Sequence, residues 1–287
     1  MTVEDMVHWA DDNTALVMGV LALISIIILW RVRVLRVGGL DAGRRDVKPI
    51  PAAMWLFCGI TTWFGILLGG YLGVEILGTI EGDGTPQDQA VMTILAYGFA
   101  SLVGGGILWF VHKQASESGT KPDWVDIPLG VGLFVVVIPL IALAGIVANA
   151  VARGLDTVQQ DPLAHNTLRL IAQNRDNGWN WALIAAIVLL VPIAEELTFR
   201  VYFQSMFLRI VRSRWAAVFA SSAVFTIAHW GAIPDDGKHA LASIFVLSVA
   251  IGASYERTGR LGVPIVLHMC FNAANIIVAF VITPITE

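Results

Sequence analysis

Residues 191–200 read VPIAEELTFR and place two adjacent carboxylates, Glu195 and Glu196, and the guanidinium of Arg200 at the end of a long apolar run. The run begins at Trp179 and contains no charged residue before Glu195. About 20 consecutive apolar residues cross a bilayer as a helix. Ionisable groups within such a helix are energetically costly and are typical of functional sites. The stretch therefore predicts a transmembrane helix that carries reactive groups.

The composition of the whole chain agrees with a membrane protein. Of its 287 residues, 56% are hydrophobic and 14% are charged, whereas soluble domains average about 45–50% and about 25%. These fractions argue against a soluble enzyme and a disordered chain, and the net charge of −4 argues against binding of nucleic acid. We predict an all-α polytopic protein with about eight transmembrane helices, at residues 14–30, 52–79, 89–111, 127–151, 179–199, 215–234, 239–255 and 262–282.

The positive-inside rule assigns an orientation to these eight segments. With the N-terminus outside, 14 of the 18 lysine and arginine residues fall in cytoplasmic loops. Three of the other four lie in the long 152–178 loop, where the rule is weakest. We therefore expect a multi-pass protein of the plasma membrane, embedded in its lipid bilayer, with both termini outside.

Gly65, Gly69 and Gly73 recur every four residues in the second segment. Small residues at this spacing form one face of a helix and let a neighbouring helix approach closely. We expect this face to be a contact between helices and not a functional site.

Reactive side chains are concentrated in the last third of the chain. They form three short motifs: Glu195-Glu196-x-x-x-Arg200, Phe225-x-x-x-His229 and His268-x-x-x-Asn272. The first four segments hold no comparable ionisable groups at their centres. We therefore divide the chain into an N-terminal transmembrane region, residues 1–178, and a catalytic transmembrane domain, residues 179–284.

The spacing within the first motif separates the roles of its two acids. Glu196 and Arg200 stand four residues apart with the acid first, which is the better order for an ion pair on a helix. At low dielectric this pair keeps Glu196 ionised and fixed. Glu195 points about 100° away around the helix and has no partner nearby in the sequence. Of the two acids, Glu195 is therefore the one free to act as a base.

The third motif offers hydrogen-bond donors on one helix face. The amide of Asn272 donates, and the ring of His268 donates or accepts. Together they can stabilise a developing oxyanion, which requires preorganised donors in a dry site. Glu195 then takes a proton from a water molecule that His229 helps to position, and this water attacks a peptide carbonyl. The motifs therefore predict hydrolysis of a peptide bond.

A metal-dependent alternative uses the same side chains. Glu195, His229 and His268 form a two-histidine, one-carboxylate set that Zn²⁺ accepts. The sequence lacks the HExxH signature of zinc peptidases, so the motifs do not require zinc. We favour a reaction without a metal or other cofactor and keep Zn²⁺ as the alternative.

Taken together, the three motifs resemble those of the CPBP family of intramembrane proteases. This family, also called Abi, includes CAAX-processing, bacteriocin-processing and Rce1-type enzymes. The resemblance covers about residues 180–282. It implies an eight-helix endopeptidase whose catalytic cavity opens to the cytosol, and a membrane-embedded or lipid-modified protein as substrate.

Motif position within the family implies a role for each residue. Water activation falls to Glu195 and His229, oxyanion stabilisation to His268 and Asn272, and support of the site to Glu196, Arg200 and Phe225. Because eight helices suffice to enclose a cavity, we expect a monomer.

Two other functions are compatible with the same groups. A non-catalytic membrane scaffold or bacteriocin-immunity relative would keep the fold without using Glu195 as a base. A proton-coupled transporter would use the Glu/His cluster as a proton relay. The sequence shows no internal repeat of the kind that transporters built from inverted halves contain, which makes the transporter the weaker alternative.

The expected ends of the transmembrane segments place Glu195 and His229 at different depths in the membrane. Glu195 is 16 residues past Trp179, or about 24 Å down a helix that enters from outside. His229 is 14 residues past Trp215, or about 21 Å up a helix that enters from inside. The two side chains meet only if a span end is misplaced, the helices tilt, or residues 201–213 project beyond the membrane. We favour a misplaced span end.

Overall fold

The chain forms a bundle of helices in the computed structural model. The structure describes residues 13–42, 45, 47, 49–78, 84–114, 120, 122–153 and 166–282. All regular secondary structure in these residues is helical, and eight of their helices are long and apolar enough to cross a membrane. The predicted all-α polytopic membrane fold is therefore confirmed.

The eight spans are α2 (Thr14–Arg31), α3 (Ala52–Leu77), α4 (Pro86–Gln114), α5 (Asp126–Arg153), the composite segment Gly178–Val211, α10 (Arg214–Ala228), α11 (Ala240–Thr258) and α12 (Gly262–Ile282). Three short helices connect them: α6 (Asn166–Gln173), η3 (Trp230–Ala232) and η4 (Asp235–Gly237).

Two π-helical stretches interrupt the α-helix of the composite segment. It consists of α7 (Gly178–Ala185), the π-helix η1 (Ala186–Leu190), α8 (Val191–Glu196), the π-helix η2 (Leu197–Phe203) and α9 (Gln204–Val211). Proline has no backbone N–H and its ring crowds the preceding turn, so Pro192 disturbs the helix just after η1. There the N–H of Val191 bonds to the carbonyl of Ala186, five residues back. Short π-helical stretches are frequent at functional sites, and these two flank the acidic pair.

The length of this segment resolves the problem of depth. The helix continues to Val211, so the predicted end at residue 199 was wrong. Measured from the turn between α9 and α10, Glu195 is 16 residues from Val211 and His229 is 15 residues from Arg214, which correspond to about 24 Å and about 22 Å. The two side chains therefore lie at similar depth.

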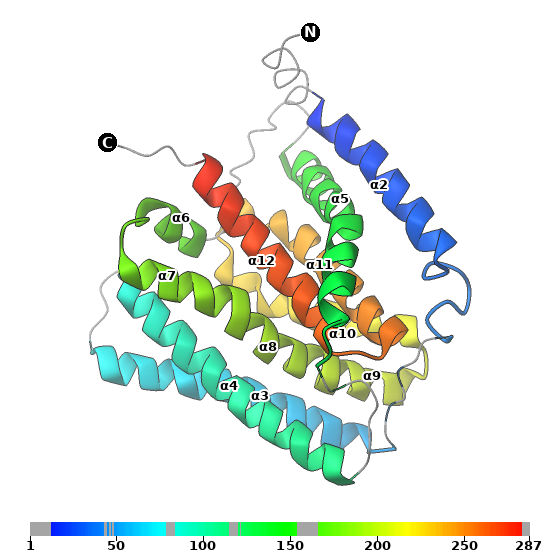
Figure 1. Ribbon diagram of the computed structural model, residues 1–287, viewed down its shortest axis with the longest axis horizontal. Coiled ribbons are helices and arrows are strands. Elements are labelled where there is room, and N and C mark those ends of the chain that lie inside the picture. The colour runs from blue at the N-terminus through cyan, green and yellow to red at the C-terminus, as the bar shows by residue number, and fades with distance from the viewer. Residues whose placement is uncertain are drawn as a thin grey trace.

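Helices α3 and α4 lie side by side along the composite segment (Figure 1). Their contact uses the face of Gly65, Gly69 and Gly73, all of which are buried. A Cβ atom on Gly69 would lie 2.3 Å from the carbonyl oxygen of Leu95, and one on Gly65 would lie 3.0 Å from Cα of Ala100. The predicted helix contact is confirmed, because the backbones meet where side chains would hold them apart.

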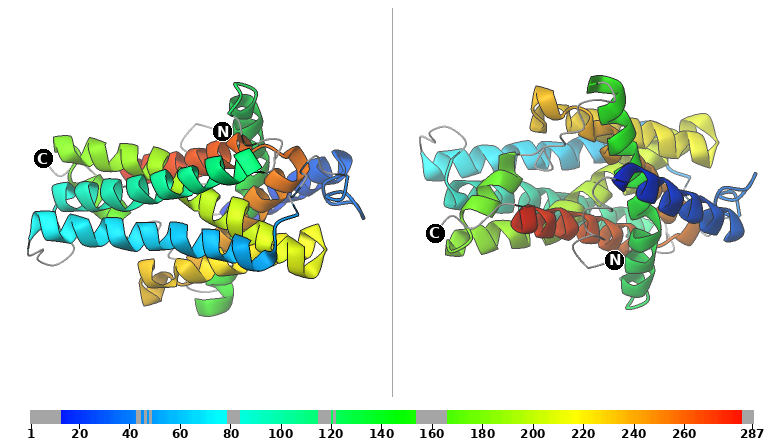
Figure 2. Two further views of the ribbon diagram at one scale, coloured as in Figure 1. Left: turned by 90° about the horizontal axis from the view of Figure 1, so that it is seen from below. Right: turned by 90° about the horizontal axis from the view of Figure 1, so that it is seen from above.

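Helix α5 runs at a steep inclination to the other long helices (Figure 2) and contacts α2, α11 and α12. Helix α12 in turn contacts α5, α6, α8, η1 and α11, which gives it a central place in the bundle. Its last turn is held by Arg175, whose Nη2 donates to the carbonyl oxygen of Phe280 at 2.6 Å. Because α12 touches both α8 and η1, its side chains reach the acidic pair.

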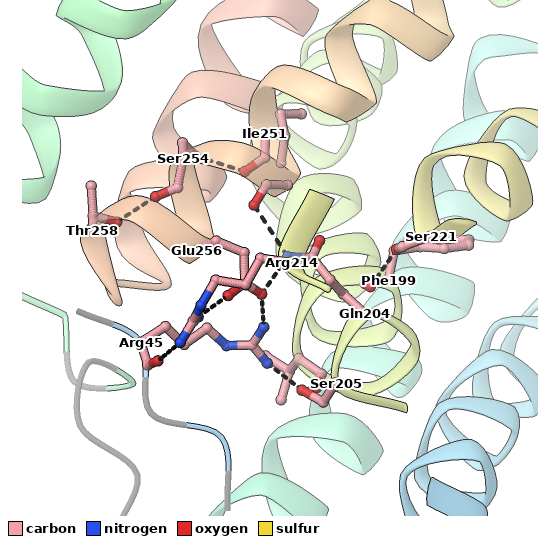
Figure 3. Close-up of polar contacts among 12 residues, drawn as sticks. Arg45, Phe199, Gln204, Ser205, Arg214, Ser221, Ile251, Ser254, Glu256 and Thr258 are labelled. Carbon is pink, nitrogen blue, oxygen red and sulfur yellow. Dashed lines mark hydrogen bonds and ion pairs between the residues drawn. The ribbon is translucent and has the colours of Figure 1, made fainter. Parts of the chain in front are cut away.

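A buried ionic network joins neighbouring ends of several helices (Figure 3). The carboxylate of Glu256, at the end of α11, pairs with Arg45 and Arg214 and accepts a hydrogen bond from Gln204 at 2.8 Å. Arg45 is also hydrogen-bonded to Ser205. The chain after α2 is thereby fastened to α9, α10 and α11 on the side opposite the loop between α10 and α11.

Because α3 and α4 approach closely, we expect an alanine substitution to affect stability differently at the adjacent residues Gly69 and Gly70. Gly69→Ala should destabilise the protein by about 1–3 kcal/mol, because the added methyl overlaps the α4 backbone. Gly70→Ala should be tolerated, since a Cβ atom there meets only Ala96 at 4.0 Å. Thermal unfolding of both variants in the same detergent checks this. Equal unfolding temperatures for the two would contradict the close contact.

Candidate active site

The structure brings residues from all three motifs together around Glu195. Nε2 of His229, at the end of α10, lies 3.8 Å from Oε1 of Glu195. Nε2 of His268, on α12, lies 3.7 Å from Oε2 of the same carboxylate. Glu195 is buried, whereas a quarter of the His229 side chain is exposed. His229 is therefore the more exposed of the two partners in this contact.

Glu196 has both carboxylate oxygens engaged by basic side chains. Nε of Arg200 donates to Oε2 at 2.8 Å, and Nδ1 of His268 lies 2.8 Å from Oε1. Arg200 is itself fully buried and donates from Nη2 to Ser248 of α11 at 3.0 Å. The ion pair expected from the four-residue spacing is present, and it leaves Glu196 little freedom to exchange protons.

The hydrogen bond at Nδ1 sets the tautomer of His229. Nδ1 lies 2.8 Å from the carbonyl oxygen of Phe225, and a carbonyl only accepts. Nδ1 therefore carries the proton, and Nε2 of the neutral ring is an acceptor. The ring thus turns an acceptor toward the Glu195 carboxylate, which is also an acceptor. At 3.8 Å, this gap suits a molecule that donates to both, and water has the two donors required.

The two α12 residues share one helix face but have different partners. Nδ1 of His268 bonds to Glu196, so its Nε2 faces Glu195. Asn272 donates from Nδ2 to the carbonyl oxygen of Ile187 at 2.9 Å. In a regular α-helix this carbonyl would accept from Val191, but η1 diverts that N–H to Ala186. One of the two amide protons of Asn272 therefore fastens α12 to the π-helix, and the other remains for a ligand.

Aromatic rings surround the charged groups. The Phe225 ring lies 4.4 Å from the His229 ring and 4.9 Å from the Phe199 ring, measured between centroids. Cζ of Arg200 lies 5.2 Å from the Phe225 centroid, which is cation–π range. Phe225 therefore packs the second motif against the first. Sequence reasoning missed Phe199 and Ser248, whose spacing carries no signal that distinguishes them from other residues of their helices.

The donor set for the zinc alternative consists of Glu195, His229 and His268. Both histidines direct Nε2 toward this carboxylate. Nevertheless, among the residues that the structure describes, no group of three or more His, Cys, Asp or Glu side chains is arranged to hold a metal ion. We therefore derive no chemical step through a metal.

Comparison with known protein families yields one match. Residues 177–274 match the family model described as type II CAAX prenyl endopeptidase Rce1-like. The matched stretch contains all three motifs, and the match confirms their resemblance to CPBP and Rce1-type proteases. No curated protein and no solved structure matches the chain.

Removing Arg200 should leave Glu196 as a buried, poorly compensated charge. Arg200→Ala should lower the free energy of unfolding by about 3–5 kcal/mol, the usual consequence of breaking a buried ion pair from one side. The double variant Arg200→Ala/Glu196→Gln also removes the unpaired negative charge, so it should recover part of the lost free energy of unfolding. Thermal unfolding of both variants in detergent tests the pairing. A fully stable Arg200→Ala protein would refute it.

Proposed function

We propose that the chain is an intramembrane endopeptidase that hydrolyses a peptide bond of a lipid-modified or membrane-embedded protein, because residues 177–274 match the Rce1-like family model. One observation carries the proposal: Glu195 and His229 present two acceptors to each other across 3.8 Å in a buried site. The natural occupant of such a gap is the water molecule that hydrolysis consumes.

In the first step, the water donates one proton toward Oε1 of Glu195 and the other toward Nε2 of His229. Two hydrogen bonds of about 2.8 Å span a 3.8 Å gap when they meet at about a right angle. Glu195 takes one proton as the water oxygen bonds to the peptide carbonyl carbon. Burial supports this role, since a carboxylate with few hydrogen bonds and little water around it is a stronger base than an exposed one.

In the second step, the carbonyl oxygen becomes an oxyanion beside α12. The second amide proton of Asn272 stabilises it. His268 also stabilises it as an imidazolium, whose Nδ1–H donates to Glu196 and whose Nε2–H faces the oxyanion. The C–N bond then breaks, and the proton held by Glu195 passes to the leaving amine. The proton that the former water molecule still carries passes to the amine by way of Nε2 of His229. The products are a carboxylate and an ammonium group, and Glu195 returns to its ionised form. Preorganised donors of this kind contribute factors of about 10² to 10³ each.

The orientation in the membrane is also part of the proposal. Arg45, Arg214 and Arg257 gather at one end of the bundle, around the end of α11. Basic residues favour the cytoplasmic side, and this supports an orientation with both termini outside. We further propose a plasma-membrane monomer whose catalytic cavity opens toward the cytosol, where lipid-modified protein tails are available.

A scaffold or immunity relative of the same fold is the second candidate, and a proton-coupled transporter is the third. A scaffold needs the Glu196–Arg200 pair for stability but has no use for the gap between Glu195 and His229. A transporter needs proton movement at the same cluster without cleavage of a peptide. Each makes a different prediction for Glu195.

Replacing Glu195 by Gln should abolish peptide cleavage, because the amide keeps the shape of the side chain but cannot take a proton. We expect a loss of at least about 10³-fold for purified protein in nanodiscs with a farnesylated peptide ending in a CAAX sequence, since the base is essential to the step. Glu75→Gln, a change at an exposed carboxyl in α3, is the matched control and should retain activity. Full cleavage by a folded Glu195→Gln protein would exclude the mechanism.

Metal dependence is decided in the same assay. Prolonged chelation followed by dialysis should leave the cleavage rate within about twofold of its starting value, because water is activated by side chains alone. The metal content of the protein is measured in parallel. Activity that disappears on chelation and returns only with Zn²⁺ would replace this mechanism by the zinc alternative.

A further inference from the structure

Helix α4 contributes a side chain to the site that none of the three motifs contains. Tyr97 lies close enough to the Glu195 carboxylate for its phenol to interact with it electrostatically. Tyr97 belongs to the N-terminal region, and helix α4 runs along α7, η1, α8 and η2. The reactive carboxylate is therefore contacted from outside the matched domain.

A contact seven residues further along α4 identifies the face of this helix that meets the composite segment. There the Tyr202 hydroxyl of η2 donates to the carbonyl oxygen of Gly104 at 2.6 Å. A Cβ atom on Gly104 would lie 3.4 Å from Leu197, so the helices touch closely at this point. Seven residues make about two helical turns, which places Tyr97 and Gly104 on the same face of α4. Tyr97 therefore lies on the face of α4 that packs against the composite segment.

Glu195 lacks the partners that its neighbour has. Its Oε2 atom is buried and makes no hydrogen bond that satisfies normal geometry. The two histidine nitrogens, at 3.7 and 3.8 Å, are too distant for direct hydrogen bonds. Without a further donor, a carboxylate in this situation would be free to rotate, and a base that rotates spends little time aligned with its water.

A tyrosine suits this place better than a cation would. Arg200 neutralises Glu196 and thereby makes it a poor base. A phenol donates one hydrogen bond and carries no charge, so it orients a carboxylate without removing its capacity to take a proton.

We propose that Tyr97 is a positioning residue of the active site, whose hydroxyl orients the Glu195 carboxylate toward the water held with His229. The inference rests on the proposed function of Glu195. It adds a residue of the N-terminal region to the catalytic arrangement.

The test compares two tyrosines that differ in what their hydroxyls touch. Tyr97→Phe removes the donor to Glu195, and Tyr202→Phe removes the donor to Gly104 between the same two helices. For Tyr97→Phe we expect kcat for the farnesylated peptide to fall about 10- to 100-fold with KM unchanged, as for a misaligned group. The acidic limb of the pH–rate profile should also move to higher pH, because the carboxylate loses a donor to its ionised form. For Tyr202→Phe we expect a lower unfolding temperature with kcat and the pH profile retained.

The possible outcomes separate this inference from the proposed function. If Glu195→Gln is inactive but Tyr97→Phe keeps the wild-type kcat and pH profile, the positioning role of Tyr97 is wrong and the proposed function stands. If Glu195→Gln cleaves normally, both are wrong. If Tyr97→Phe does not fold, 3-fluorotyrosine at position 97 replaces it. This stronger donor should move the acidic limb to lower pH, and an unchanged limb would overturn the inference.

Discussion

The arrangement of the site depends on a buried ion pair between Glu196 and Arg200. Both side chains are fully buried, and neither charge is stable in an apolar interior without the other. The pair also binds His268 of α12 and Ser248 of α11, so one charged cluster ties three helices together. Because Glu195 precedes Glu196 on the same helix, it is turned about 100° away and is left in the gap between the two histidines. The reactive carboxylate is thus positioned by its unreactive neighbour.

The helix that carries both acids is irregular for a reason found in its sequence. Pro192 has no backbone N–H and comes directly after the π-helix η1. The change in pitch releases the carbonyl of Ile187, which binds Asn272 of α12. A second π-helix follows the acids and contains Arg200. The irregular stretches therefore serve packing and function together: one anchors the proposed oxyanion side, and the other carries the counterion of Glu196.

Sequence reasoning was most successful where the relevant contacts are local. The Glu196–Arg200 pair and the glycine face of α3 follow from helical periodicity alone, and both are present. The end of the fifth span was missed because Arg209 and Arg212 mark a membrane boundary in composition, whereas the helix itself continues to Val211. Tyr97 and Ser248 reach the charged groups from helices that are apolar all round, where spacing does not identify the inward face. The division at residue 178 remains a prediction, and α4, which precedes it, packs against η1 and α8, which follow it.

The central claim is that Glu195 acts as the base of a proteolytic reaction in the membrane. The most direct measurement compares new peptide N-termini in membranes of cells that make the wild-type chain with those of cells that make Glu195→Gln, at equal expression. Proteolysis through Glu195 predicts a set of N-termini that is present with the wild-type chain and absent with the variant, and this set identifies the substrates. Identical sets, with the variant folded and its biological phenotype intact, would contradict catalysis and favour a scaffold.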